Sequence, residues 1–131
     1  MIQQLSSGAE LLGYIIRSER YPDKSTFYTP STAHLQVGHI VYEHGQEIGR
    51  HVHLPVERTI TSTTEVLLVQ KGHCVMDVYD SDRQRVCESE LVEGDIVVML
   101  GGGHGFRMIE DTILLEIKQG PYGGMHEKER F

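Results

Sequence analysis

A succession of short strand-like runs constrains this chain more than any other feature of its sequence. Turn residues separate the runs, which recur about every ten residues. The runs are rich in β-branched and aromatic residues and cover positions 11–17, 35–43, 65–71, 73–80, 84–91, 95–100, 104–109 and 113–119. No stretch keeps a 3.6-residue apolar period, and the nearest one, 6–16, is interrupted by Gly8 and Gly13. The pattern predicts an all-β sandwich or barrel with almost no helix.

Length and charge narrow the class of protein further. A chain of 131 residues suits a single domain, 1–131, whose core can pack without disulfides. The formal charge is −7, from 19 acidic and 12 basic side chains, which argues against a nucleic-acid partner. No apolar run approaches the ~20 residues of a membrane span, and the N-terminal residues lack a signal-peptide pattern. For the same reason we expect no membrane partner. Cys74 and Cys87 form no CxxC motif, so we expect free thiols in a cytoplasmic protein.

Histidine is unusually frequent, with eight residues in the chain, and two of these stand close together in Gly-Arg-His-Val-His. If this segment is a strand, His51 and His53 project from the same face, where two imidazoles can share one metal ion. The residues around this pair add to the pattern. Gly45 lies six residues before His51, and Glu65 follows the pair and lies seven residues before Gly72.

A second cluster follows later in the chain. Gly94-Asp95 opens a strand-like run that ends in the glycines 101–103, directly before His104. Together the two clusters resemble the two-part signature of the cupin superfamily, over roughly Val37 to Lys118. The resemblance implies a double-stranded β-helix, or jelly-roll barrel, with a short N-terminal region 1–34, a barrel core 35–119 and a tail 120–131. It also implies one divalent metal ion in the barrel mouth, held by His51, His53, Glu65 and His104.

The sequence departs from the cupin pattern in two places. Eleven residues, 54–64, separate the His-x-His pair from Glu65, where the family has a short gap. Glu57 satisfies the short gap, but Glu65 shares a strand face with Leu67 and Val69, so we expect Glu65 to point inward and to be the ligand. Glu57 or water in its place, and a metal-free cupin with surface histidines, remain open. The second departure is the glycine run 101–103, where the family has a proline.

Further polar side chains are candidates for binding or catalysis. The candidates for substrate binding are Arg58, Arg107, Lys118 and Gln119. The candidates for acid–base catalysis are His44, Glu57, Glu116 and Tyr122. In the run 113–119, Glu116 and Lys118 alternate with apolar residues, so they line the barrel or face solvent, and solvent is the expectation. The tail 120–131 is expected at the surface, with Phe131 able to pack back onto the domain.

These observations lead to two hypotheses of function. The first is a cupin enzyme that uses Fe, Mn, Ni or Zn to isomerise, epimerise or oxygenate a small polar metabolite such as a sugar or sugar acid. The alternative is a cupin that binds or senses a small ligand without chemistry. We also expect a homodimer, because both faces of the run 73–80 carry apolar side chains that need cover. The segment Lys118 to Gly124 resembles that of small uncharacterised bacterial cupins, some of which are associated with surface-polysaccharide sugar pathways.

Overall fold

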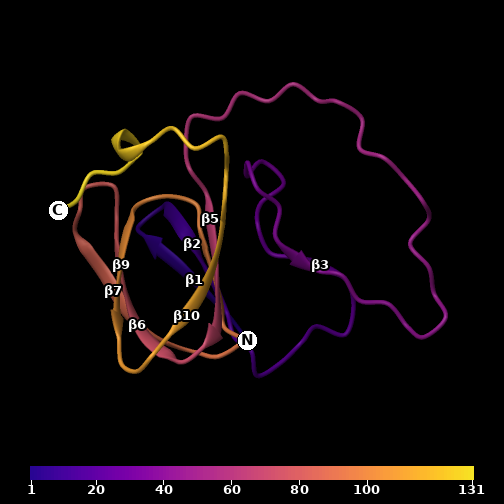
Figure 1. Ribbon diagram of the computed structural model, residues 1–131, viewed down its shortest axis with the longest axis horizontal. Coiled ribbons are helices and arrows are strands. Elements are labelled where there is room, and N and C mark those ends of the chain that lie inside the picture. The colour runs from indigo at the N-terminus through magenta and orange to yellow at the C-terminus, as the bar shows by residue number, and fades with distance from the viewer. The chain divides into compact units, whose positions relative to one another are not determined.

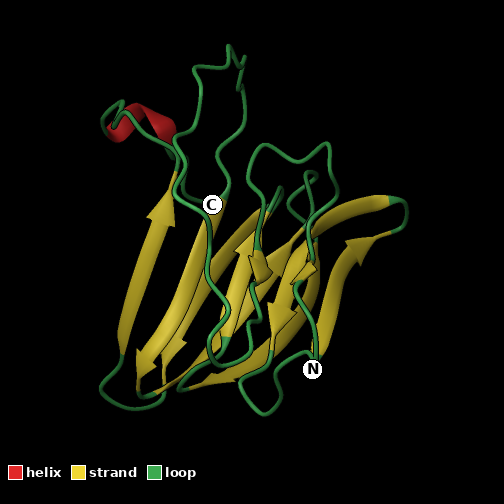
Figure 2. Cartoon of the chain, turned by 90° about the vertical axis from the view of Figure 1, so that its right-hand side faces the viewer, coloured by secondary structure: helices red, strands yellow, loops and turns green.

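The computed structural model describes the whole chain, residues 1–131, as strands and turns (Figure 2). Its single helical element is a 3₁₀ turn, η1 (Met125–Glu127). All strand pairings are antiparallel. The predicted all-β class is therefore confirmed. No helix has the length and apolar character needed to cross a membrane.

The chain forms two compact units. Residues Met1–Arg20 and Ser62–Phe131 form the first, which we call the sandwich unit. Residues Tyr21–Thr61 form the second, which we call the loop unit. The expected regions 1–34, 35–119 and 120–131 of a single domain stay a prediction.

The first sheet of the sandwich unit has five strands. Their order is β1 (Ile2–Ser7), β2 (Glu10–Ile16), β8 (Ile96–Met99), β5 (Glu65–Lys71) and β10 (Ile113–Lys118). Seven of the eight expected runs lie within two residues of an observed strand of the two sheets. The polar strand β1 was not predicted, since its sequence IQQLSS buries only Leu5.

The second sheet has three strands in the order β7 (Arg85–Val92), β6 (His73–Tyr79) and β9 (Gly103–Met108) (Figure 1). One core joins the two sheets, because buried side chains of both belong to a single apolar cluster. Its members are Leu5, Leu12, Ile15, Leu67, Val69, Cys74, Met76, Val78, Leu91, Val97 and Met99. The arrangement is consistent with a β-sandwich.

Strand β6 is covered on both faces within the single chain. Cys74, Met76 and Val78 are fully buried in the core, as the period-2 alternation requires. Val75 on the opposite face is also buried, between its register partners Glu90 and Arg107. The two-sided apolar pattern therefore does not need a second copy to cover it. The homodimer stays a prediction without support from this strand.

The two faces of strand β10 differ in their exposure to solvent, which bears on Glu116 and Lys118. Leu114 packs against the core, whereas Leu115 and Ile117 are exposed. Since Glu116 and Lys118 alternate with the exposed residues, they share the side of Leu114. The expectation that this polar face meets solvent holds for Glu116, which is exposed, whereas Lys118 at the end of the strand is partly buried.

The loop unit contains two short strands, β3 (Thr26–Phe27) and β4 (Gly38–His39), which pair with each other. The strand expected over 35–43 is thus reduced to two residues. A hydrogen bond of 2.6 Å joins the Tyr28 hydroxyl to Nδ1 of His39. Residues 40–61 form no regular secondary structure.

Candidate functional site

A cavity of about 760 Å³ opens at one end of the sandwich unit. Antiparallel pairing explains its location, because it aligns the start of one strand with the end of the next. Glu65 at the start of β5 is the register partner of both Lys118 and Met99, which end β10 and β8. Tyr79 at the end of β6 pairs with Gly103 at the start of β9. All five residues line the cavity.

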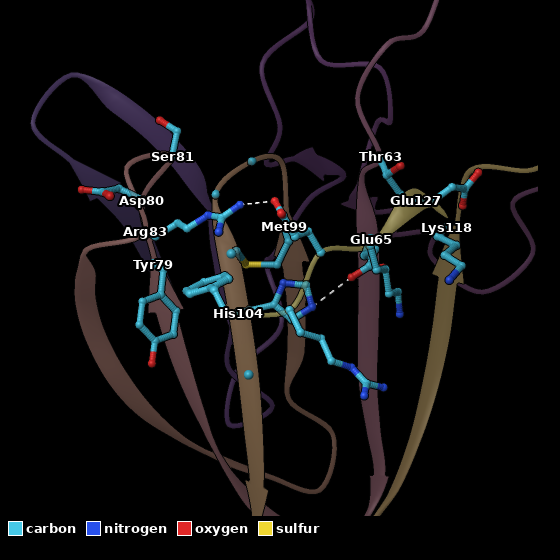
Figure 3. Close-up of a pocket in the computed structure, with 18 residues that line it drawn as sticks. Thr63, Glu65, Tyr79, Asp80, Ser81, Arg83, Met99, His104, Lys118 and Glu127 are labelled. Atoms are coloured by element: carbon cyan, nitrogen blue, oxygen red, sulfur yellow. Dashed lines mark hydrogen bonds and ion pairs between the residues drawn. The ribbon is translucent and has the colours of Figure 1, made fainter. Parts of the chain in front are cut away.

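Two of the predicted metal ligands meet in this cavity. The Nε2 atom of His104 lies 3.0 Å from Oε2 of Glu65 (Figure 3). The side chain of Glu65 is 9% exposed and that of His104 is 26% exposed. The two residues come from different sheets, β5 and β9, so the sandwich packing brings them together. The prediction that Glu65 points inward with Leu67 and Val69 is confirmed.

The environment of Glu65 favours its ionised form. The hydrogen bond from His104 lowers the pKa of the Glu65 carboxyl most strongly. Burial opposes this shift, and the positive charges of His104, Lys128 and Lys118 add to it, so that the pKa lies below its ordinary value. At neutral pH Glu65 is therefore an anionic oxygen donor beside an imidazole, a pair suited to a divalent cation.

The other two predicted ligands, His51 and His53, lie in the loop unit. Their rings are neighbours, with centroids 5.2 Å apart and an edge-on angle of 75°. Nδ1 of His51 lies 2.8 Å from the carbonyl oxygen of Gly49. Because a carbonyl can only accept, Nδ1 carries the proton in the neutral ring, and Nε2 keeps its lone pair. Glu57, the alternative acid, is exposed in the same unit.

Neither unit by itself brings three or more histidine, cysteine or acidic side chains into position around one ion. The sandwich unit brings together Glu65 and His104, and the loop unit brings together His51 and His53. Each pair has the donor chemistry that Fe, Mn, Ni or Zn accepts. The metal itself stays a prediction.

The four candidates for substrate binding lie in different parts of the structure, and one of them lines the cavity. Lys118 lines the cavity. The Gln119 side-chain oxygen accepts a hydrogen bond from the backbone N–H of Thr64, so it ties two chain segments together. Arg107 does not line the cavity, and its guanidinium lies 2.6 Å from Glu88 on the three-stranded sheet. Arg58 is exposed in the loop unit.

The candidates for acid–base catalysis are not among the residues that line the cavity. Glu116 lies 3.5 Å from Lys118 and forms an ion pair with it. Tyr122 is exposed in the segment after β10. His44 and Glu57 are exposed in the loop unit. Within the cavity, Glu65 and His104 themselves are the pair placed for proton transfer.

Sequence reasoning missed two parts of the cavity wall. One is the turn after β6, which contributes Asp80, Ser81 and Arg83. The other is the C-terminal segment 127–131. The suggestion that Phe131 packs back onto the domain is confirmed, since its ring meets Tyr79 edge-on with centroids 5.1 Å apart. Polar turn and tail residues carry no periodic signal that would have marked them.

Comparisons of the chain with protein-family models, with curated proteins and with solved structures found no match. The resemblance to cupins therefore rests on the sequence motifs around His51, His53, Glu65 and His104.

Proposed function

We propose that this protein is a metal-binding cupin with a jelly-roll fold, which acts on or binds a small polar metabolite. Its ligands in the sandwich unit are Glu65 and His104, and the sequence motif predicts His51 and His53 as the other two. Glu65 and His104 are supported by their geometry in the sandwich unit, and His51 and His53 by the sequence motif. The all-β, antiparallel architecture is compatible with the jelly roll.

The observation that carries the proposal is the distance of 3.0 Å between the Glu65 and His104 donor atoms at the cavity. Two donors that bind one ion at about 2.1 Å from adjacent octahedral positions are about 3.0 Å apart. A carboxylate oxygen and an imidazole nitrogen are also the donor types of the proposed set. The pair is thus compatible with a shared ion as well as with a direct hydrogen bond.

A second observation concerns the protonation of His51. Histidine ligands commonly donate the other ring N–H to a carbonyl or carboxylate, which fixes the ring and its tautomer. The contact between His51 Nδ1 and the Gly49 carbonyl has this form. It leaves Nε2 available as a ligand.

A divalent ion in this site would supply Lewis acidity toward a carbonyl or hydroxyl oxygen of the metabolite. Glu65 contributes the negative charge that partly neutralises a dication, and Lys118 offers a donor at the cavity wall. An isomerase, epimerase or oxygenase would use these groups. The alternative, a protein that binds its ligand without chemistry, is favoured by one observation: none of His44, Glu57, Glu116 and Tyr122 lines the cavity.

Metal content tests the proposal. Protein purified without chelators, and protein reloaded with Mn, Fe(II), Ni or Zn, would be analysed for bound metal. We expect about one ion per chain in the wild type and a large loss in His51→Ala and His104→Ala, because each removes one donor. The matched control is His126→Ala, since His126 is exposed in η1 and belongs to neither pair. Full occupancy in His51→Ala and His104→Ala would refute the proposal.

The same assay decides between the two acids. We expect Glu65→Gln to weaken metal binding, though less than the loss of a histidine, because the amide keeps an oxygen donor but loses the charge. We expect Glu57→Gln to stay near the wild type. Metal loss in Glu57→Gln with retention in Glu65→Gln would show that Glu57 is the ligand.

A further inference from the structure

The C-terminal segment Glu127–Phe131 forms one wall of the cavity that contains Glu65 and His104. A terminal segment of five residues has little structure of its own, so it forms a wall only where side-chain contacts hold it. The sandwich unit provides such contacts at Tyr79, Arg83 and Gly103.

These three residues hold Phe131 and Glu129. The Phe131 ring packs edge-on against Tyr79, and the Arg83 guanidinium lies 5.3 Å from the centre of the same ring, within the range of a cation–π contact. Arg83 also forms an ion pair with Glu129. At Gly103 a Cβ atom would lie only 2.9 Å from the Phe131 ring, so glycine leaves the room that the ring occupies.

The turn before β7 aims Arg83 at this segment. Arg83 is the only non-glycine residue with a positive φ, 64°, a conformation that needs support from its surroundings. Asp80 supplies this support, because its carboxylate accepts the backbone N–H groups of Asp82 and Gln84. Its carbonyl accepts the N–H of Arg83 at 3.0 Å.

The segment also brings a positive charge to the cavity. Lys118 and Lys128 both line the cavity, and the charges of both act on the Glu65 carboxylate. Lys128 forms no hydrogen bond or ion pair, and Lys118 pairs only with Glu116 at 3.5 Å. The carboxylate of Glu65 is already engaged by His104. Two ammonium groups at a cavity wall with this little compensation favour an anion.

We propose that the cavity takes a small anionic ligand, whose carboxylate or phosphate group lies between Lys118 and Lys128, and that the C-terminal segment is the wall that presents Lys128. This inference rests on the proposed function, because it places the anionic ligand in the same cavity as the metal ion. Three further acids line the cavity, and each is already engaged: Glu129 pairs with Arg83, Asp80 accepts the N–H groups of Asp82 and Gln84, and Glu127 accepts the N–H of Gly123. They therefore leave the ammonium group of Lys128 without a partner. An anionic ligand is the partner that balances such a site.

Calorimetric titration tests the ligand class, with succinate and inorganic phosphate as probes and glycerol as the neutral comparison. We expect Lys118→Gln and Lys128→Gln each to weaken the binding of an anionic probe about tenfold, as for the loss of one charge-assisted hydrogen bond. Lys71→Gln is the matched control, because Lys71 is exposed at the opposite end of β5. Absence of anion binding to the wild type, or equal binding by all three variants, would overturn the proposal.

Release of Phe131 by carboxypeptidase A tests the wall without any ligand. We expect Arg83→Gln to speed the release several-fold and to weaken succinate binding together with it. Arg85→Gln is the control, since Arg85 is similarly exposed and forms ion pairs with Asp77 and Glu88. Equal release rates in both variants would overturn the role of the C-terminal segment.

Titrations of metal-free and metal-loaded protein separate this inference from the proposed function. If the wild type holds no metal but binds succinate through both lysines, the proposed metal site fails and the anion site stands. If the protein holds its metal and binds no anionic probe in either form, the anion site fails and the metal site stands.

Discussion

Replacing Gly102 by alanine tests how the glycine run before His104 builds the cavity. Gly102 has φ +68°, in the left-handed region that side chains other than glycine rarely adopt. A Cβ atom there would lie 2.2 Å from the carbonyl oxygen of Tyr79 and 2.8 Å from Cδ2 of Leu12. The first of these neighbours is backbone within β6, so it cannot rotate away.

Two costs therefore combine in Gly102→Ala. The left-handed backbone costs a residue with a Cβ about 1–2 kcal/mol. Inserting a methyl group into packed surroundings costs about 1–3 kcal/mol more. We expect the free energy of unfolding to fall by about 2–5 kcal/mol. Since His104 follows two residues later, a shift of the backbone would also move its ring relative to Glu65 and lower metal content.

Gly101→Ala is the matched control. Gly101 has no positive φ, and an added Cβ meets nothing within 4 Å. We expect a change in the free energy of unfolding within about 0.5 kcal/mol. Urea denaturation followed by circular dichroism measures both variants, and elemental analysis reports their metal content. Equal stability of Gly101→Ala and Gly102→Ala would refute the reasoning, because both variants add the same methyl group one residue apart.

Three further predictions concern other parts of the sandwich unit. Asp95 is buried and accepts hydrogen bonds from the backbone N–H groups of Ser18 and Val92 and from Arg17, so we expect Asp95→Ala to lower the free energy of unfolding by about 3 kcal/mol in urea denaturation. The control, Glu88→Ala, removes only exposed ion pairs and should lower it by less than about 1 kcal/mol. A larger loss in Glu88→Ala than in Asp95→Ala would contradict this ranking. The hydrogen bond from the Gln84 N–H lowers the pKa of the Asp80 carboxyl below 3.8, so its stabilisation is fully present above that pH and is lost as pH falls through the lowered pKa. Urea denaturation should therefore show the stability difference between wild type and Asp80→Ala shrinking as the pH falls below 3.8, and a difference that grows on acidification would contradict the sign. Burial raises the pKa of the Cys74 thiol, whereas Cys87 is partly exposed. An aromatic disulfide reagent should therefore modify Cys87 in the native protein and Cys74 only after unfolding. Rapid modification of both thiols would contradict this prediction and show that β6 opens.

The strands and the direction of Glu65 were predictable from the sequence because they depend on local alternation. In β5 the residues Glu65, Leu67 and Val69 occupy one face by the period of the strand alone, whatever the strand pairs with. The strand β1 was not predictable in the same way. Its polar sequence carries no apolar alternation, and its strand conformation depends on backbone hydrogen bonds to β2.

Tertiary structure decided everything that depends on which elements meet. The contact between Glu65 and His104 joins residues from two sheets, so their separation along the sequence does not predict the distance between them in space. The face of β10 that carries Lys118 became the inner one only through pairing with β5. The cavity wall at Phe131 required Tyr79, Arg83 and a side-chain-free position at Gly103, which lie 28 to 52 residues away in sequence. Local patterns determine which way a side chain points, whereas long-range packing determines what it faces, and the candidate site depends on both.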